Sequence, residues 1–347
     1  MKRLINHIIF QLISWLIVYN VLTIFVYLIR RDQPEALSYI TGGLFWASVA
    51  AFVIAILLGI SDFYFNRMER NFESFKKVIL AKSVLYVLVI SLTIFIANVV
   101  GFFIEGEMDL WAFMKSPAFA TIFLFSIIIC FFLNFIQQVN KKFGQGELWA
   151  VILGKYFKPR AEKRIFMFLD LRSSTKYAEL LGHIKYSELI QRCFHYINLV
   201  VPQYKARLYQ YVGDEAVLTW SWEEGLYQNR CIGLYFALAD LIRHKADRLK
   251  EEFGLIPEFK AGVHGGDITV AEVGDIKREI AYHGDVINTA ARIQGKCNDF
   301  RRELLVSKII HDHLHGHTWK SEKMGEVQLK GKKEPVIVYS ITNQGVI

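Results

Sequence analysis

The amino-acid sequence predicts an α+β protein in which an N-terminal four-helix transmembrane domain precedes a domain of mixed helices and strands. The mean hydropathy of +0.27 and the 53% share of hydrophobic residues among 347 are too high for a wholly soluble chain. Four long apolar runs precede residue 140, whereas strand-like and helix-like segments alternate beyond residue 164. The second half has no glycine-rich βαβ fingerprint, which argues against a doubly wound parallel sheet.

The apolar runs cover residues 4–29, 40–60, 78–104 and 118–136. Each is close to the roughly 20 residues that a helix needs to cross a bilayer. Lys2 and Arg3 precede the first run, and Lys76 and Lys77 precede the third. The positive-inside rule therefore predicts an integral protein of the cell (inner) membrane with a cytoplasmic C-terminal domain. Lys82, near the start of the third run, is expected to reach for the membrane surface, so no intramembrane ion or proton pathway is predicted.

Charge and cysteine usage narrow the partners of the soluble part. The net charge is +8, but Lys and Arg are scattered among Asp and Glu without an arginine-rich block. We therefore expect no nucleic-acid binding, and assign the excess to cytoplasmic loops and an anionic substrate. The four cysteines lie far apart with no C-x-x-C pair, which is typical of reduced thiols facing the cytoplasm. Membrane lipid is the expected partner of the N-terminal half.

The same patterns divide the chain into a transmembrane domain over 1–137, a connector over 138–163 and a C-terminal domain over 164–347. In the last of these, apolar periodicity predicts helices over 186–201, 223–252 and 285–296. It predicts strands over 165–171, 208–212, 215–222, 258–264, 304–306, 325–329 and 336–341.

Two carboxylates stand where predicted strands end. Asp170 closes the apolar strand in FLDLRSST, and Asp214 lies at the hairpin tip in YQYVGDEAV. A carboxylate there is costly to bury unless it is paired or binds a metal. Neighbouring strands would let the pair hold Mg²⁺, which takes hard oxygen ligands and leaves positions open for phosphates. Ser173, Ser174 and Thr175 then open a helix whose free N–H groups suit phosphate.

Each carboxylate also has an ordinary structural interpretation when it is taken alone. Asp170 fits the region before a helix start, and Asp214 fits a turn. The segment GDVINTAARIQGKC adds Asn288 and Arg292, which are four residues apart and so share one helix face. Together they could meet one phosphate, with Arg292 stabilising an oxyanion. A solvated polar helix face is the alternative, and Lys330 in LKG is either a phosphate contact or a surface charge.

Read in order, these segments resemble the class III nucleotidyl cyclases, the adenylate and guanylate cyclase family, in its membrane-anchored bacterial type. The segments are FLDLRSST, VGDEAVLTW, AGVHGGDITVAEVG, YHGDVINTAARI and VQLKGKKEPVIVYSI, over about residues 163–341. The resemblance implies a ferredoxin-like palm fold that works as a homodimer with a shared active site. It implies that Asp170, Leu171 and Asp214 bind two Mg²⁺ or Mn²⁺ ions. It further implies that the second chain supplies Asn288 and Arg292 for the transition state and Lys330 for phosphate.

The positions that select the base depart from the family pattern. Gln210 stands four residues before Asp214, where adenylate cyclases of the family carry Lys and guanylate cyclases Glu. Ala281 stands three residues before Gly284. At that position adenylate cyclases of the family carry Asp or Thr, and guanylate cyclases carry Cys. Gln210 can donate and accept hydrogen bonds, whereas Ala281 offers no side-chain partner.

The implied activity is conversion of ATP to 3′,5′-cyclic AMP and pyrophosphate. The alternatives are a guanylate or pyrimidine nucleotidyl cyclase with the same mechanism, and a catalytically silent membrane sensor that binds nucleotide.

Overall fold

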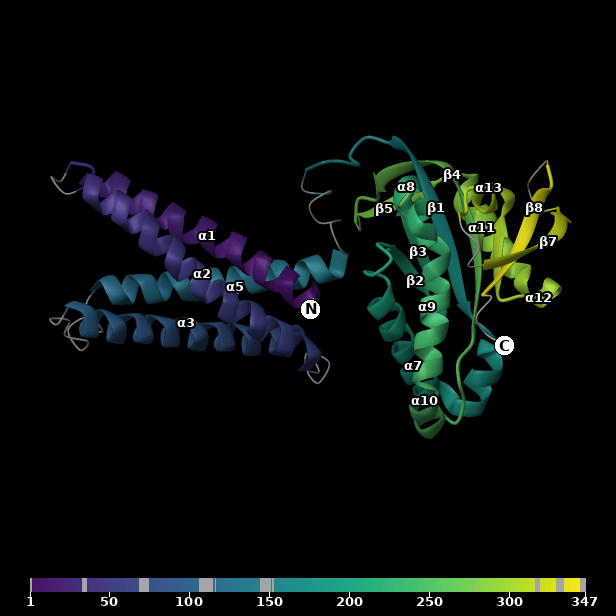
Figure 1. The fold of residues 1–347 in the computed structure, drawn as a ribbon, viewed down its shortest axis with the longest axis horizontal. Helices are drawn as coiled ribbons and strands as arrows, with labels where there is room; N and C mark the ends of the chain where they lie inside the picture. The colour runs from purple at the N-terminus through teal and green to yellow at the C-terminus, as the bar shows by residue number, and fades with distance from the viewer. Residues whose placement is uncertain are drawn as a thin grey trace. The chain divides into compact units, whose positions relative to one another are not determined.

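The protein is described from a computed structural model that divides the chain into two compact units, Met1–Lys142 and Phe143–Ile347. Figure 1 shows the fold of each unit. The structure describes residues 2–32, 36–68, 75–105, 115, 117–143, 151, 153–276, 278–315, 319–328 and 334–343.

The first unit is built from long helices. They are α1 (Lys2–Arg30), α2 (Ala36–Met68), α3 (Phe75–Glu105) and α5 (Pro117–Phe143). Three are long and apolar enough to cross a membrane, over His7–Ile29, Ala47–Phe65 and Phe123–Asn140. The remaining expected span, 78–104, falls in α3, whose side chains beyond residue 93 lie outside the described residues. Apolar side chains such as Ile17, Phe52 and Leu88 are exposed on this unit, as expected where lipid replaces water.

The second unit has a mixed sheet covered by helices. Its strands are β1 (Arg160–Leu171), β2 (Arg207–Val212), β3 (Glu215–Ser221), β4 (Phe259–Val273), β5 (Glu279–His283), β6 (Leu304–Ser307), β7 (Trp319–Val327) and β8 (Val336–Asn343). Its helices are α7 (Ser174–Val200), α8 (Trp222–Leu226), the 3₁₀ turn Tyr227–Asn229, α9 (Arg230–His244), α10 (Ala246–Phe253), α11 (Asp285–Gly295), α12 (Cys297–Phe300) and α13 (Lys308–His311).

The strand order confirms the predicted α+β class. The described strands follow one another as β2-β3-β1-β4-β6-β8-β7, with β5 beside β4. The contacts β2–β3, β3–β1 and β1–β4 are all antiparallel. Together with α7 and α9 these four strands form the β-α-β-β-α-β arrangement of ferredoxin-like folds. The parallel contact β4–β6 and the antiparallel contact β6–β8 extend this core.

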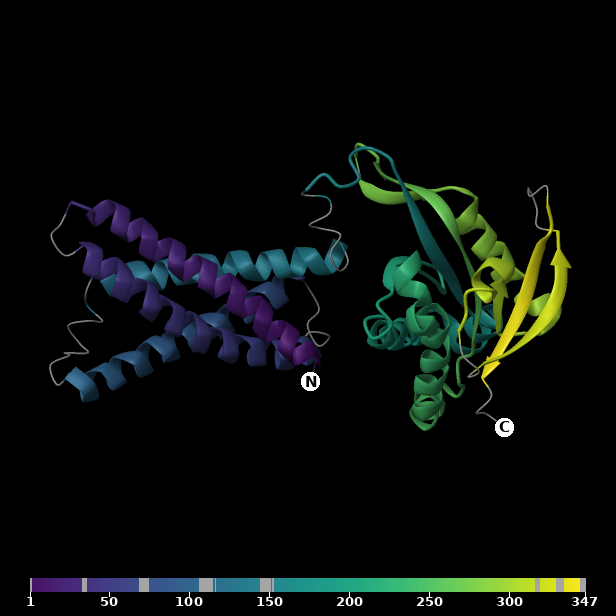
Figure 2. The ribbon, with the colours of Figure 1, turned by 45° about the horizontal axis from the view of Figure 1, so that its top comes forward.

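Strand β1 is buried on both faces, which explains its continuous apolar run. Ile165, Met167 and Leu169 pack into a core with α7 and α9, whereas Phe166 and Phe168 pack into a second core with α11. Figures 1 and 2 show α7 and α9 on one side of the sheet and α11 on the other. Because side chains alternate along a strand, the next even-numbered residue, Asp170, lies on the α11 side.

Several element boundaries differ from the sequence predictions. The helix expected over 223–252 is divided into α8, α9 and α10: it breaks at Gln228 and Asn229, which both adopt positive φ, and again at Lys245, which is not helical. Strand β4 continues nine residues beyond its expected end at 264, because Gly265 and Gly266 interrupt the apolar pattern without interrupting the strand. A Cβ on Gly265 would lie 2.9 Å from the ring of Trp222, so glycine here permits close packing. Strand β5, which carries Ala281, had no clear sequence signal.

Helix α11 approaches β4 most closely at Gly262. A Cβ at Gly262 would stand 2.6 Å from the Cα of Gln294 and 2.7 Å from the carbonyl oxygen of Ala290. Only glycine allows this separation without a shift of main-chain atoms. The contact therefore fixes the position of α11 along β4, and with it the position of Gln294.

Gly262→Ala is expected to destabilise the second unit by roughly 1–3 kcal/mol, because overpacking forces α11 away from β4. Thermal unfolding of the detergent-solubilised chain, followed by circular dichroism, measures the change. Gly295→Ala, on α11, is the matched control, since a Cβ there meets nothing within 4 Å. It should be neutral or stabilising by up to about 1 kcal/mol. Equal effects of the two substitutions would contradict this account of the packing.

Candidate active site

Asp170 lies at the centre of a polar cluster at one end of β1. The sheet register places Glu215 of β3 opposite Asp170 on one side and Lys260 of β4 opposite it on the other. The Lys260 ammonium nitrogen is 3.1 Å from Oδ2 of Asp170. Gln294 of α11, which is 7% exposed, donates its Nε2 hydrogen to the same oxygen at 3.0 Å. Side chains from β4 and α11 therefore hold this carboxylate in place.

Asp214 occupies the tight turn between β2 and β3, beside Glu215. Gly213 before it has φ 62°, which lets the two-residue turn close. Oδ2 of Asp214 is buried and has no hydrogen-bond partner among the described residues. A buried carboxylate oxygen without a donor is costly unless a cation meets it. Asp170 ends β1, and Asp214 lies in the turn that leads into β3, the strand paired with β1, so the two sequence-predicted carboxylates come to the same end of neighbouring strands.

The electrostatics of this corner are strongly negative. Burial and, after it, the charges of Asp170 and Asp214 together raise the pKa of Glu215 to about 7, although Lys260 opposes the shift. Burial also raises the pKa of Tyr186 on α7, and the charge of Asp214 adds to that increase. Burial is the first cause of both shifts, and the nearby aspartate charges act in the same direction. A divalent cation would compensate these charges.

The loop after β1 is shaped for a close turn. Ser173 adopts the left-handed conformation with φ 57°, and α7 begins at Ser174. Ser173 and Thr175 are exposed, so the first turn of α7 is open to a ligand. The Leu171 side chain is 1% exposed in the core with α7 and α9. Its hydrocarbon side chain cannot bind a metal, which leaves only its main-chain carbonyl oxygen for that role.

Asn288 and Arg292 share the outer face of α11. Asn288 is exposed and Arg292 half-buried, whereas Ala290 and Ile293 face the sheet. Neither polar side chain has a hydrogen-bond or ion-pair partner in the described part of the chain. The described residues show no contact between this pair and Asp170, which α11 reaches through Gln294 instead. Lys330 lies outside the described residues.

The two base-selecting candidates lie on β2 and β5, two strands that are not paired with each other but whose residues Tyr209 and Tyr282 pack against the same core. Gln210 is exposed on β2, next to a register shift between Leu208 and Gln210. Ala281 is half-buried on β5 opposite Ala271. The residues beside them, Tyr209 and Tyr282, are in edge-to-face contact with ring centroids 4.8 Å apart. Strand alternation therefore turns Gln210 and Ala281 away from this aromatic contact.

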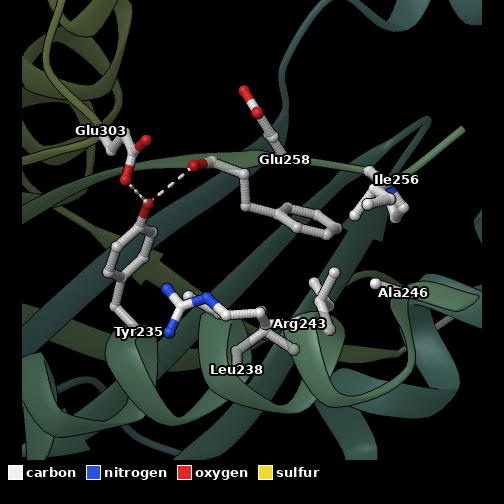
Figure 3. Close-up of a pocket in the computed structure, with 11 residues that line it drawn as sticks. Tyr235, Leu238, Arg243, Ala246, Ile256, Glu258 and Glu303 are labelled. Carbon is white, nitrogen blue, oxygen red and sulfur yellow. Dashed lines mark hydrogen bonds between the residues drawn. The ribbon is translucent and has the colours of Figure 1, made fainter. Parts of the chain in front are cut away.

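A separate cavity of about 210 Å³ opens between α9 and the start of β4, as Figure 3 shows. The Tyr235 hydroxyl donates to the carbonyl oxygen of Phe259 at 2.8 Å and lies 3.3 Å from the Glu303 carboxylate. Its lining includes Arg243 and Glu258 but none of the sequence-predicted site residues. The cavity borders the residue before Lys260 and is distinct from the Asp170 cluster.

Among the described residues, no three His, Cys, Asp or Glu side chains form a group arranged to hold a metal ion. Two aspartates suffice only where substrate oxygens complete the coordination, which is the usual manner of Mg²⁺ binding with phosphates. Glu215, Lys260 and Gln294 also belong to this site and were not predicted from the sequence. A polar Lys260 inside an otherwise apolar strand was the one available signal. The other two depend on register and helix position.

Residues 158–343 match the family described as the adenylate and guanylate cyclase catalytic domain. The match spans more than half of the chain. The chain belongs to this family. The resemblance seen in the sequence motifs is therefore confirmed, and the cyclase catalytic domain comprises the sheet and helices of the second unit.

Two cyclases of Rhizobium meliloti (strain 1021) are similar in sequence. Adenylate cyclase 2 is 33% identical over 209 residues, which are 60% of this chain and 58% of that protein. Adenylate cyclase 1 is 23% identical over 178 residues, which are 50% of this chain and 27% of that protein. The chain thus spans less than two thirds of either relative. A solved structure of a bacterial light-regulated adenylyl cyclase aligns with a TM-score of 0.56 at 15% identity, over 66% of this chain and 67% of that one, and shows the shared fold.

Lys260→Met removes the only cation that the described residues place in ion-pair contact with the Asp170 cluster. In EDTA the variant cyclase should be destabilised by roughly 1–3 kcal/mol, because a partly buried negative charge is left unpaired. Adding Mg²⁺ should stabilise the variant more than the unmodified chain, since a divalent ion replaces the lost charge. Thermal unfolding in EDTA and in Mg²⁺ provides the measurement.

The control is Lys320→Met on β7, an exposed lysine whose removal should change stability by less than about 0.5 kcal/mol. A Lys260→Met chain that melts identically in EDTA and in Mg²⁺ would refute the cation site.

Proposed function

We propose that this chain is a membrane-bound adenylate cyclase that converts ATP to 3′,5′-cyclic AMP and pyrophosphate in a site shared by two identical chains, with two Mg²⁺ or Mn²⁺ ions per site. The single observation that carries the proposal is the unpartnered, buried Oδ2 of Asp214 beside Asp170 and Glu215. Family membership and the names of the similar cyclases support the same conclusion.

The residues fit a divalent metal, and Asp170 and Asp214 would hold it, together with the Leu171 carbonyl oxygen. Bound ions supply charge neutralisation for the triphosphate and lower the pKa of the ribose 3′-hydroxyl. By holding the ions, Asp170 and Asp214 would fix the place where the triphosphate binds. Glu215 and Lys260 set the electrostatic balance around them.

The reaction forms one bond and breaks one. The ribose 3′-oxygen bonds to the α-phosphorus and its proton passes to solvent, while the bond from that phosphorus to the bridging oxygen of the β-phosphate breaks. The departing pyrophosphate would lie at the start of α7, where Ser173, Ser174 and Thr175 offer main-chain N–H groups. Lys330 would contact the same phosphates. Arg292 stabilises the charge that develops on the α-phosphate, and Asn288 hydrogen-bonds a ribose or phosphate oxygen.

The position of α11 supports a site shared across a homodimer. In one chain, Gln294 contacts Asp170 while Asn288 and Arg292 lie on the outer face of the same helix. A two-fold axis would carry those two side chains to the metal-binding carboxylates of the second chain, and would create two equivalent sites. A silent domain that only binds nucleotide is less well supported, because both metal carboxylates and both transition-state residues are present.

The choice of base leaves a second candidate substrate. The Gln210 amide can donate and accept, which suits the edge of adenine. It equally suits guanine or a pyrimidine, and Ala281 adds no side-chain discrimination. GTP or a pyrimidine triphosphate is therefore the second candidate substrate, with unchanged phosphate chemistry.

The membrane unit would place the cyclase domain at the inner face of the cell membrane. We propose that α1, α2, α3 and α5 all span the lipid. The basic residues Lys2, Arg3, Lys76 and Lys77 favour cytoplasmic ends for α1 and α3. An even number of spans then returns Phe143 and the cyclase domain to the cytoplasm.

Asp214→Asn should reduce turnover by about 10³-fold or more, because the substitution removes the anionic ligand and leaves the turn geometry intact. Cyclic nucleotide formation by the purified full-length chain is the readout, with circular dichroism to confirm the fold. Asp240→Asn on α9 is the matched control, since Asp240 pairs only with the exposed Arg243 among the described residues. Full activity of Asp214→Asn would reject the metal assignment.

Mixing two inactive chains tests the shared site. Asp214→Asn and Arg292→Ala should each be inactive alone. In a mixed dimer one of the two shared sites is intact, so mixed dimers isolated after co-expression should show about half of the unmodified rate. The rate is measured after purification through two different affinity tags. No recovery in verified mixed dimers would place all site residues within one chain.

A further inference from the structure

A network of buried polar side chains occupies the interior of the membrane unit. Its centre is Asp62 on α2, which is 0% exposed and forms an ion pair with Lys82 of α3 at 2.8 Å. The Tyr86 hydroxyl donates to Oδ1 of Asp62 at 2.7 Å. Gln11 of α1 donates to Oδ2 at 2.6 Å. Both oxygens of the carboxylate are therefore engaged.

The network reaches every long helix of the unit. On α1, Gln11 also contacts the Tyr86 hydroxyl and accepts from Nε1 of Trp15 at 3.1 Å. On the opposite side, the Lys82 ammonium group donates to the side-chain oxygen of Gln137 on α5. Lys82 is 1% exposed, so the expectation that it reaches for the membrane surface is wrong. Its ion pair with Asp62 holds it inside the bundle.

Holding helices together in lipid through such a network costs free energy. Burying two charges costs several kcal/mol per ion, and well-packed apolar side chains commonly do as well or better. Ionisable groups within membrane helices are rare and are concentrated in functional elements. Packing of the bundle alone therefore does not account for Asp62 and Lys82.

The α5 side of the network is less complete than the α2–α3 side. Nε2 of Gln137, Nε2 of Gln138 and Oδ1 of Asn134 are buried without a hydrogen-bond partner among the described residues. A rotation or slide of α5 would let these amides find new partners while the Asp62–Lys82 pair stays intact. Partly satisfied polar networks are the elements for which a second arrangement is energetically close. Helix α5 is also the helix that leads along the chain into the cyclase domain at Phe143.

We propose that the Asp62-centred network is a regulatory device that sets the position of α5, and through α5 the turnover of the cyclase domain. The Asp62–Lys82 pair fixes α2 against α3, and the Lys82–Gln137 contact transmits that arrangement to α5. This inference rests on the proposed function for one of its two readouts.

The test uses the full chain in lipid nanodiscs and two variants that separate stability from regulation. Gln137→Leu disconnects α5 and keeps the ion pair. Asp62→Asn combined with Lys82→Met removes both charges, so neither is left unpaired in lipid. The controls are Ser61→Ala, whose hydroxyl bonds only its own helix among the described residues, and the exposed Lys76→Met on α3.

Both test variants should change kcat by about fivefold or more, the range of ordinary allosteric coupling, with KM for the triphosphate within about twofold because the site itself is untouched. Amide hydrogen exchange in residues 134–143 should change in the same variants. Both controls should match the unmodified chain in both readouts.

Folded variants with unchanged kcat and unchanged exchange would overturn the proposal, and so would a changed melting temperature as the only effect. An unmodified chain that makes no cyclic nucleotide would reject the proposed function instead. In that case unchanged exchange at 134–143 would still overturn the link to α5, and changed exchange would support it.

Discussion

The structure of the cyclase domain depends on the concentration of negative charge at one corner of its sheet. Asp170, Asp214 and Glu215 meet there because β1 and β3 are paired in a register that sets Asp170 opposite Glu215. Lys260 and Gln294 offset part of the repulsion by contacting one oxygen of Asp170. The raised pKa of Glu215, which has burial as its first cause and the two aspartates as its second, and the unpartnered oxygen of Asp214 mark this corner. Its negative charge favours a cation there, and a polyphosphate could approach only after a cation had neutralised that charge.

The rest of the domain keeps that corner rigid. Strand β1 is packed on both faces, so Asp170 cannot relieve repulsion by moving its main chain. Gly262 lets α11 lie directly on β4, which places Gln294 at Asp170 and sends Asn288 and Arg292 to the outer face. One helix thus connects Asp170, the carboxylate proposed to bind metal in its own chain, with the residues proposed for the site of the second chain. The membrane unit contains another buried charge cluster, and there the charges are paired across α2 and α3.

The sequence was informative where a residue conflicts with its local pattern. Asp170 and Asp214 could be recognised as site candidates because a carboxylate interrupts or ends an apolar strand. Asn288 and Arg292 could be recognised because their spacing on one helix is a local property of the sequence. Glu215 and Gln294 could not be assigned to the site from the sequence. The strand register places Glu215 there, and the packing of α11 against Gly262 places Gln294 there. Lys82 was placed wrongly because its partner Asp62 is distant in sequence, and a lone lysine near a helix start is normally free to reach water. The break at Gln228 and Asn229 escaped notice because neither residue is a usual helix breaker.

The most direct measurement is the identity of the product. The purified full-length chain is incubated with ATP, GTP, CTP and UTP together, first in Mg²⁺ and then in Mn²⁺, and the products are separated by mass spectrometry. We expect one dominant 3′,5′-cyclic nucleotide, cyclic AMP, together with pyrophosphate. A different cyclic nucleotide would keep the phosphate chemistry and change the base assigned to Gln210 and Ala281. No cyclic product with either metal would contradict the central claim that Asp170 and Asp214 form a catalytic metal site.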